Sequence, residues 1–197
     1  MAQEAASGLS LSQIRFIPAS EPWQREPPGA TAHQRLEMVR LACAGNPVFV
    51  VDDREIRRGG PSYSVDTLSE LRAELGADQP LCLLLGADAF LGLASWHRWQ
   101  DLFGLAHFVV AHRPGFSQVS WADKMPPVLQ QALAARQTDD ASALAKAPAG
   151  HILTYALTPL DISASRIRTD LQQNKSPRYL VPDAILNYIS QNKLYSE

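Results

Sequence analysis

Cysteine is scarce in this chain of 197 residues, which contains only Cys43 and Cys82. The two lie far apart in apolar surroundings, and the sequence has no Cys-x-x-Cys pair and no Cys/His cluster. These spacings argue against a zinc site. Both cysteines are better interpreted as small buried hydrophobic residues of a protein kept in a reducing compartment.

Long apolar runs are also missing. Runs such as residues 83–85 are far too short to span a bilayer. The opening residues, MAQEAASGLSLSQ, have neither a basic start nor a continuous apolar core, so they do not form a signal peptide. The sequence therefore predicts a soluble, cytoplasmic protein.

An excess of positive charge is absent too, because the net charge is -2. Nucleic acid is therefore not expected as the main partner, although a few arginines would suffice to bind one nucleotide. The chain is 46% hydrophobic and 19% charged, which is ordinary for a chain that buries a core. Its length fits a single domain over residues 1–197.

Strand-like and helix-like stretches alternate, which predicts an α/β fold with a Rossmann-like parallel sheet and helices on both faces. The expected strands are residues 14–17, 48–51, 81–85, 107–111 and 152–157. The expected helices begin at Thr31, which with Gln34 forms a capping box, and at Ser62 or Ser64, and cover 98–103, 165–173 and 183–192.

Two regions fall outside this alternation. Residues 115–150 are interpreted as a variable insertion, with a helix that begins at the Pro126–Pro127 pair and a loop over 137–150. Residues 161–197 form the C-terminal helical part.

Polar and aromatic residues follow the expected strands, where ligands bind in such sheets. Gly86 and Asp88 directly follow the strand at 81–85, although a tight turn with Asp88 capping a helix explains them better when they are taken alone. Trp96 could stack on a flat heterocycle or anchor the core, and His97 could bind a carboxylate beside that ring. Trp99 is assigned to the core.

Two serine-rich segments precede helices. Ser163 and Ser165 lie at a helix start, where free amides and the dipole favour an anion, and Arg168 lies one turn further. Arg113 ends a strand and could bind phosphate, and Ser64 follows Tyr63 at another helix start. A plain helix cap is the alternative for both serine segments.

Six segments occur together in an order typical of one family: FIPA, PSYSVDTL, GADAF, WHRW, AHRPG and ISASRIR. With them the chain resembles the bacterial nicotinate-mononucleotide adenylyltransferases of the nucleotidyltransferase superfamily, over nearly its whole length. The resemblance implies that ATP and nicotinate mononucleotide give deamido-NAD and pyrophosphate, with Mg²⁺ accompanying ATP. It leaves oligomeric state and the preference for acid over amide substrate open.

The resemblance also implies site residues. Trp96 would stack on the nicotinate ring while Ser64 and His97 hold its carboxylate, although the family often has tyrosine in place of His97. The expected ATP-binding residues are Arg25, Gly86, Asp88, Arg113, Ile162, Ser163, Ser165 and Arg168. Gln24 stands where the family often has a histidine.

The first residues depart from the family, which opens with a strand and a GGTFDPxHxGH turn whose histidines stabilise the charge that develops in the transfer. Residues 1–12 do not resemble this turn, so no catalytic residue is assigned. We expect the sheet to lack its first, central strand, in a segment of roughly 25 residues, and the chain as written to be inactive or nearly so. The alternatives are a catalytically silent nucleotide-binding protein of this fold and an adenylyltransferase for another phosphorylated acceptor.

Overall fold

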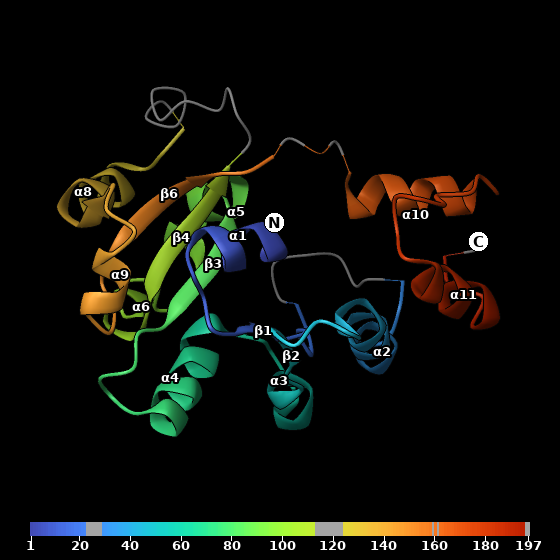
Figure 1. Cartoon of the computed structure of the whole chain (residues 1–197), viewed down its shortest axis with the longest axis horizontal. Coiled ribbons are helices and arrows are strands. Elements are labelled where there is room, and N and C mark those ends of the chain that lie inside the picture. Colours follow the sequence, from blue (N-terminus) through green and yellow to red (C-terminus); the bar gives the residue numbers. More distant parts are fainter. Residues whose placement is uncertain (23–28, 113–123, 159, 161, 196–197) are drawn as a thin grey trace. The chain divides into compact units, whose positions relative to one another are not determined.

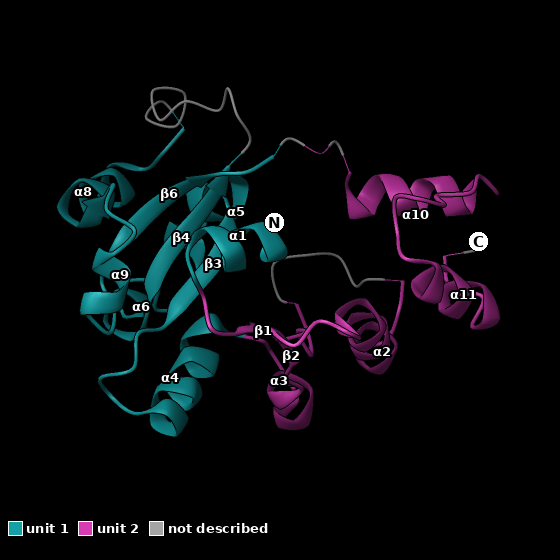
Figure 2. Cartoon of the chain, viewed as in Figure 1, with its two compact units in different colours: residues 1–10, 63–159 teal, residues 11–62, 160–197 magenta. Residues whose placement is uncertain are grey.

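The computed structural model describes residues 1–22, 29–112, 124–158, 160 and 162–195. The chain forms two compact units (Figure 2). Unit 1 comprises Met1–Ser10 and Tyr63–Pro159, and unit 2 comprises Leu11–Ser62 and Leu160–Glu197. Within the described ranges, no helix is long and apolar enough to cross a membrane.

Unit 1 is built on a four-stranded parallel sheet with the strand order β3-β4-β6-β5 (Figure 1). The strands are β3 (Cys82–Gly86), β4 (His107–His112), β5 (Gln137–Thr138) and β6 (Ile152–Ala156). The helices are α1 (Ala2–Gly8), α4 (Ser64–Leu75), α5 (Ala87–Leu91), the 3-10 turn η1 (Leu93–Ser95), α6 (Leu102–Leu105), α8 (Pro127–Arg136) and α9 (Ala143–Lys146).

Alternate residues of the central strand β4 face opposite sides of this sheet, as the strand geometry requires. On one side Phe108 packs against Phe90 of α5 and Phe103 of α6. On the other side Val109 forms a buried cluster with Leu144 of α9, and Leu9 at the end of α1 packs against it. Helices therefore cover both faces, which confirms the predicted architecture.

Unit 2 contains a two-stranded parallel sheet in which β1 (Ile14–Phe16) pairs with β2 (Phe49–Val51). Its helices are α2 (Ala32–Cys43), α3 (Arg54–Arg58), α10 (Ala164–Gln172) and α11 (Asp183–Gln191). Helix α2 packs on both β2 and α11. A buried cluster of Ala30, Ile189 and Leu194 lies between these helices.

Most predicted elements are confirmed to within a residue or two at their ends. The clearest case is α2, where the Thr31 hydroxyl accepts from the Gln34 amide and the Gln34 side chain accepts from the Thr31 amide. This reciprocal capping box satisfies two amides that the helix itself leaves unpaired. Both cysteines are free thiols; Cys43 is buried as predicted, whereas Cys82 is half-buried.

Three local predictions are wrong, and one helix was missed. Tyr63, not Ser62 or Ser64, is the N-cap of α4, and the Ser62 hydroxyl instead accepts from the Ser20 amide. The helix predicted over 98–103 is a series of turns, with α6 beginning at Leu102. The predicted loop at 137–150 contains β5 and α9, because Thr138 pairs with Leu153 and Leu144 is buried. Helix α3 was not predicted.

Candidate functional site

The carboxyl end of β3 leads straight into α5. Gly86 is the last strand residue and also the N-cap of α5, and Asp88 lies exposed in the first helical turn. A Cβ built at Gly86 would meet no described atom within 4 Å. The backbone is therefore open to close approach at the edge where parallel sheets bind ligands.

The loop after η1 carries the predicted aromatic residues. Trp96 ends η1, with its amide donating to the Leu93 carbonyl at 2.9 Å, and the Trp99 amide donates to the Trp96 carbonyl at 3.2 Å. Trp96 is half-buried, His97 is exposed, and Trp99 packs edge-on against Phe103 at 5.9 Å. Trp99 thus contacts the core as predicted, and both tryptophans are half-buried.

The start of α4 lies against this loop. The rings of Tyr63 and His97 are 4.5 Å apart between centroids and inclined by 35°. Ser64 follows Tyr63 as the first residue of α4, and its side chain is half-buried. The structure therefore brings the Pro-Ser-Tyr-Ser segment next to the Trp-His segment, and the first-turn amides of α4 add donors without intrahelical acceptors.

The third group of predicted residues lies in unit 2, at the start of α10. Ser163 is the N-cap, and its hydroxyl accepts from the Arg166 amide at 3.2 Å. An Nη2 atom of Arg168 donates to the Ser165 hydroxyl at 3.4 Å. Ile162, just before the cap, is 38% exposed. The hydroxyl and guanidinium groups thus gather at the positive end of the helix dipole.

The predicted residues fall into groups that belong to separate units. Ser64, Gly86, Asp88, Trp96 and His97 belong to unit 1. Ile162, Ser163, Ser165 and Arg168 belong to unit 2. Two further predicted ATP-binding residues, Arg25 and Arg113, lie outside the described residues, so their roles remain predictions.

The segment just beyond β6 is fixed by α1. The Glu4 carboxylate accepts from the Thr158 amide at 2.8 Å and from its hydroxyl at 2.9 Å. These hydrogen bonds hold the pKa of Glu4 below its ordinary value. Because ligands bind beyond the carboxyl ends of parallel strands, α1 stabilises an edge of the sheet that belongs to the candidate site.

One residue near the candidate site has no role that the sequence predicts. Tyr63 was noted only as part of the Pro-Ser-Tyr-Ser segment, yet its ring is the group that touches His97. The position of Tyr63 between two serines at a helix start is the one feature of the sequence that indicates a role for it. Its contact with His97 is not predictable from the sequence, because the two residues lie far apart in it.

The candidate site contains few side chains that could bind a metal ion. Over the described ranges, no three His, Cys, Asp or Glu side chains lie close enough together to hold a metal ion. Asp88 is an exposed carboxylate at the candidate site and could contact a hydrated cation.

Comparison with known proteins agrees with the geometry. The cytidylyltransferase-like family matches residues 1–170. A probable nicotinate-nucleotide adenylyltransferase of Dechloromonas aromatica is 49% identical over 196 residues, which are 99% of this chain and 89% of that protein. A probable nicotinate-nucleotide adenylyltransferase of Methylococcus capsulatus is 43% identical over 197 residues, covering 100% of this chain and 91% of that protein.

Solved structures show the same fold. The nicotinic acid mononucleotide adenylyltransferase of Plasmodium falciparum, complexed with NaAD, superposes with a TM-score of 0.65 over 96% of this chain and 90% of its own. Its sequence identity is 16%, so this likeness concerns the fold alone. The same enzyme complexed with APC gives a TM-score of 0.59 over 93% of this chain and 82% of its own.

Proposed function

The chain belongs to the nicotinate-nucleotide adenylyltransferases within the cytidylyltransferase-like family, and we propose that it transfers the adenylate of ATP to nicotinate mononucleotide. The products are deamido-NAD and pyrophosphate. The contact between Tyr63 and His97 carries this proposal, because it brings the start of α4 next to the residue that follows the half-buried Trp96. Binding a pyridine carboxylate requires a helix start, whose amides bind the carboxylate, and an aromatic face, on which the ring stacks.

The acceptor end of the site lies in unit 1. The ring of Trp96 offers an apolar face for stacking on the pyridine. The Ser64 hydroxyl and the first amides of α4 would donate to the carboxylate, which the helix dipole also favours. His97, held by Tyr63, would donate a further hydrogen bond. These donors would favour the acid over the amide form, because an amide presents one oxygen instead of two.

The adenosine would lie at the end of β3. The open backbone at Gly86 permits close approach of the ribose, and the Asp88 carboxylate would accept from the ribose hydroxyls. A phosphate-binding role is proposed for Ser163, Ser165 and Arg168 at the start of α10, within unit 2. Arg25, Arg113 and Ile162 complete the proposed ATP-binding set.

The chemistry is an in-line displacement at the α-phosphorus of ATP. A phosphate oxygen of nicotinate mononucleotide forms the new P–O bond, and the bond to the bridging oxygen of the β-phosphate breaks. Pyrophosphate leaves with the bonding electron pair, so negative charge grows on the leaving group. Arg168 and the hydroxyl donors of α10 would stabilise this charge, and a magnesium ion bound with ATP would neutralise part of it.

We place this activity in the cytoplasm, which is supported by the two free thiols, Cys43 and Cys82. The partners are the two small-molecule substrates.

The experiment that tests the proposal is a calorimetric titration of the purified chain with nicotinate mononucleotide and with MgATP, followed by an assay for pyrophosphate. Trp96→Ala is expected to weaken binding of nicotinate mononucleotide about tenfold or more, because a stacked aromatic contact is worth about 1–3 kcal/mol. ATP binding should not change. Trp99→Phe is the matched control, since it keeps an aromatic ring against Phe103.

Equal losses for both substrates in Trp96→Ala would contradict the stacking role. Binding of both substrates without pyrophosphate release would not separate a silent nucleotide-binding protein of this fold from the nearly inactive enzyme expected from the sequence, whereas pyrophosphate release would rule out the silent protein. Tighter binding of another phosphorylated acceptor would assign the chain a different substrate.

A further inference from the structure

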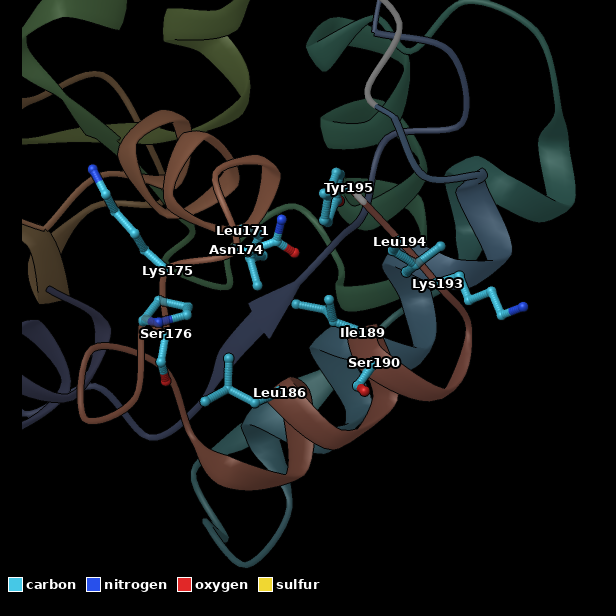
Figure 3. A pocket seen from close by; sticks show the side chains of 11 residues that line it. Leu171, Asn174, Lys175, Ser176, Leu186, Ile189, Ser190, Lys193, Leu194 and Tyr195 are labelled. Carbon is cyan, nitrogen blue, oxygen red and sulfur yellow. The ribbon is translucent and has the colours of Figure 1, made fainter. Parts of the chain in front are cut away.

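A pocket of about 380 Å³ lies in unit 2, lined by the C-terminal end of α10, by α11 and by the residues that follow each helix (Figure 3). Its apolar wall consists of Leu171 of α10, Leu186 and Ile189 of α11, and Leu194. Ile189 and Leu194 belong to the buried cluster of unit 2, so this wall is a fixed part of the core. A volume of this size with a mostly apolar lining is typical of small-molecule sites.

Helix α10 ends in a Schellman motif beside this pocket. The Asn174 amide donates to the Leu171 carbonyl at 3.0 Å, and the next amide, of Lys175, donates to the carbonyl of Asp170 at 2.7 Å. The motif requires a left-handed residue at Asn174, whose φ is 55°. Glycine is the usual residue there, because it adopts this conformation without strain. Asn174 instead presents an amide group that lines the pocket and points toward its middle (Figure 3).

Helix α11 ends in the same motif. The Lys193 amide donates to the Ser190 carbonyl at 3.2 Å, and the Leu194 amide donates to the Ile189 carbonyl at 3.0 Å. Lys193 has a φ of 49°, which is uncommon for a residue with a long side chain. Its side chain also lines the pocket. Two helix ends thus carry a side chain where glycine would be free of strain, and both side chains meet at one pocket. Such outliers cluster at ligand sites.

The charge around the pocket is positive. Among the described residues that line it, the charged ones are Lys175 and Lys193, and none is acidic. The Lys175 ammonium group donates to the neutral side-chain oxygen of Gln173 at 2.7 Å, so this contact leaves its charge in place. In Figure 3 the two ammonium groups lie on opposite sides of the pocket, at the ends of flexible stems. An anion in the pocket is therefore favoured over a cation.

We propose that this pocket binds a small molecule that combines an apolar body with one carboxylate. The apolar wall would contact the body. The Asn174 amide would donate to the carboxylate, whose charge Lys175 and Lys193 favour. None of the residues that line the pocket is among those proposed to bind ATP or nicotinate mononucleotide, so the inference goes beyond the proposed function and does not depend on it.

The test uses octanoate, which joins an apolar chain to one carboxylate, and octylammonium, which carries the same chain with the opposite charge. Each is titrated into the whole chain labelled at its leucine and isoleucine methyl groups, and the methyl NMR shifts of Ile189 are followed. Octanoate is expected to bind with a dissociation constant of about 1 mM or below. Octylammonium should bind about fivefold more weakly or not at all. Saturating MgATP and nicotinate mononucleotide should leave the octanoate shifts unchanged.

Asn174→Gly and Lys193→Gly remove the two side chains and keep the backbone conformation that closes each helix. Each variant should raise the dissociation constant for octanoate about two- to fivefold. The midpoint of thermal unfolding should stay at the wild-type value or rise, because glycine relieves the left-handed strain. Lys146→Gln, at the end of α9 in unit 1, is the control for loss of a lysine and should leave octanoate binding unchanged.

Glycine variants that bind octanoate as tightly as the wild type would overturn the inference. Equal affinity for octanoate and octylammonium would overturn it too, and that comparison requires no variant. Methyl shifts spread over both units, instead of those at the pocket, would indicate non-specific binding and end the proposal. Displacement of octanoate by MgATP would assign the pocket to the ATP site. None of these measurements uses enzymatic activity, so failure of the proposed function would leave them interpretable.

Discussion

The ring of Tyr63 lies against the ring of His97, with centroids 4.5 Å apart. Tyr63 precedes the first residue of α4, and His97 follows the residue that ends η1. One aromatic contact therefore fixes the distance between two segments that lie far apart in the sequence. The geometry of the proposed acceptor site depends on it, because Tyr63 directly precedes Ser64 and His97 directly follows Trp96.

Replacing Tyr63 with alanine should weaken binding of nicotinate mononucleotide about three- to tenfold, since aromatic pairs contribute about 0.5–1.5 kcal/mol beyond area burial. Tyr63→Phe keeps the ring and should bind almost as the wild type does. Titration calorimetry measures both. A phenylalanine variant as weak as the alanine variant would show that the hydroxyl, rather than the ring contact, matters.

Replacing Ser165 with alanine should raise the dissociation constant for MgATP about fivefold, the effect of losing one hydrogen bond of about 1 kcal/mol. Alanine is the better helix former, so the unfolding midpoint should not fall. Thr169→Ala, one turn further along the same helix, serves as the control and should leave binding unchanged. Equal weakening by both variants would remove Ser165 from the proposed phosphate site.

Local chemistry explains which parts of the fold were predictable. The capping box of Thr31 and Gln34 depends on residues three apart, so the sequence alone reveals it. Helix α3 was missed because its sequence, REIRR, has no apolar periodicity. The first residue of α3, Arg54, is instead held by Asp52. The Asp52 carboxylate accepts from the Arg54 amide at 3.0 Å and from the Arg54 Nε atom at 2.8 Å.

In the candidate site too, some features were predictable from the local sequence and others were not. Residue types at strand ends and helix starts indicated Ser64, Trp96 and Ser163, because anions and flat rings need hydroxyls, amides and aromatic faces. The side-chain pair of Tyr63 and His97 was not predictable, since it depends on how α4 and η1 pack in three dimensions. The roles that the sequence motifs assign to Ser64, Trp96 and Ser163 stay predictions, and the structure adds the contacts around these residues.

We expect low pH to destabilise the folded state of unit 1, because His107 then becomes protonated. This side chain is fully buried; its Nε2 atom lies 2.8 Å from the Ala147 carbonyl, and its Nδ1 atom accepts from the His151 amide at 3.0 Å. Nε2 therefore carries the proton, and protonating Nδ1 would break the second hydrogen bond. Burial is the main cause that lowers the pKa of His107 below its ordinary value of 6.5.

A lowered pKa means that the unfolded chain binds this proton more tightly than the folded chain does. The contribution of His107 to stability is therefore complete above pH 6.5 and is lost as the pH falls toward the lower folded value. The midpoint of thermal unfolding should decrease over that interval. His107→Gln should flatten the decrease, whereas His33→Gln, at an exposed position, should not. If the unfolding midpoint fell equally with pH in the wild type and in both variants, His107 would not be the cause of the acid destabilisation.

Arg72 holds together three segments of unit 1. Its Nη1 atom donates to the carbonyls of Gly76, Ala77 and Gln79, just beyond α4. Its Nη2 atom donates to the carbonyl of Leu105 at 2.5 Å and to that of Pro148 at 3.0 Å. A planar fork is required, because the acceptors lie in different directions from one side chain.

Arg72→Lys should therefore lower the free energy of unfolding by about 2 kcal/mol, since one ammonium group cannot reach both sets of carbonyls and leaves some unpaired. Arg98→Lys is the control, because Arg98 forms only an exposed ion pair with Asp101 and should cost about 0.5 kcal/mol or less. Urea unfolding measures both. If the two variants proved equally stable, the carbonyls around Arg72 would have to be satisfied by water, and unit 1 would not depend on this side chain.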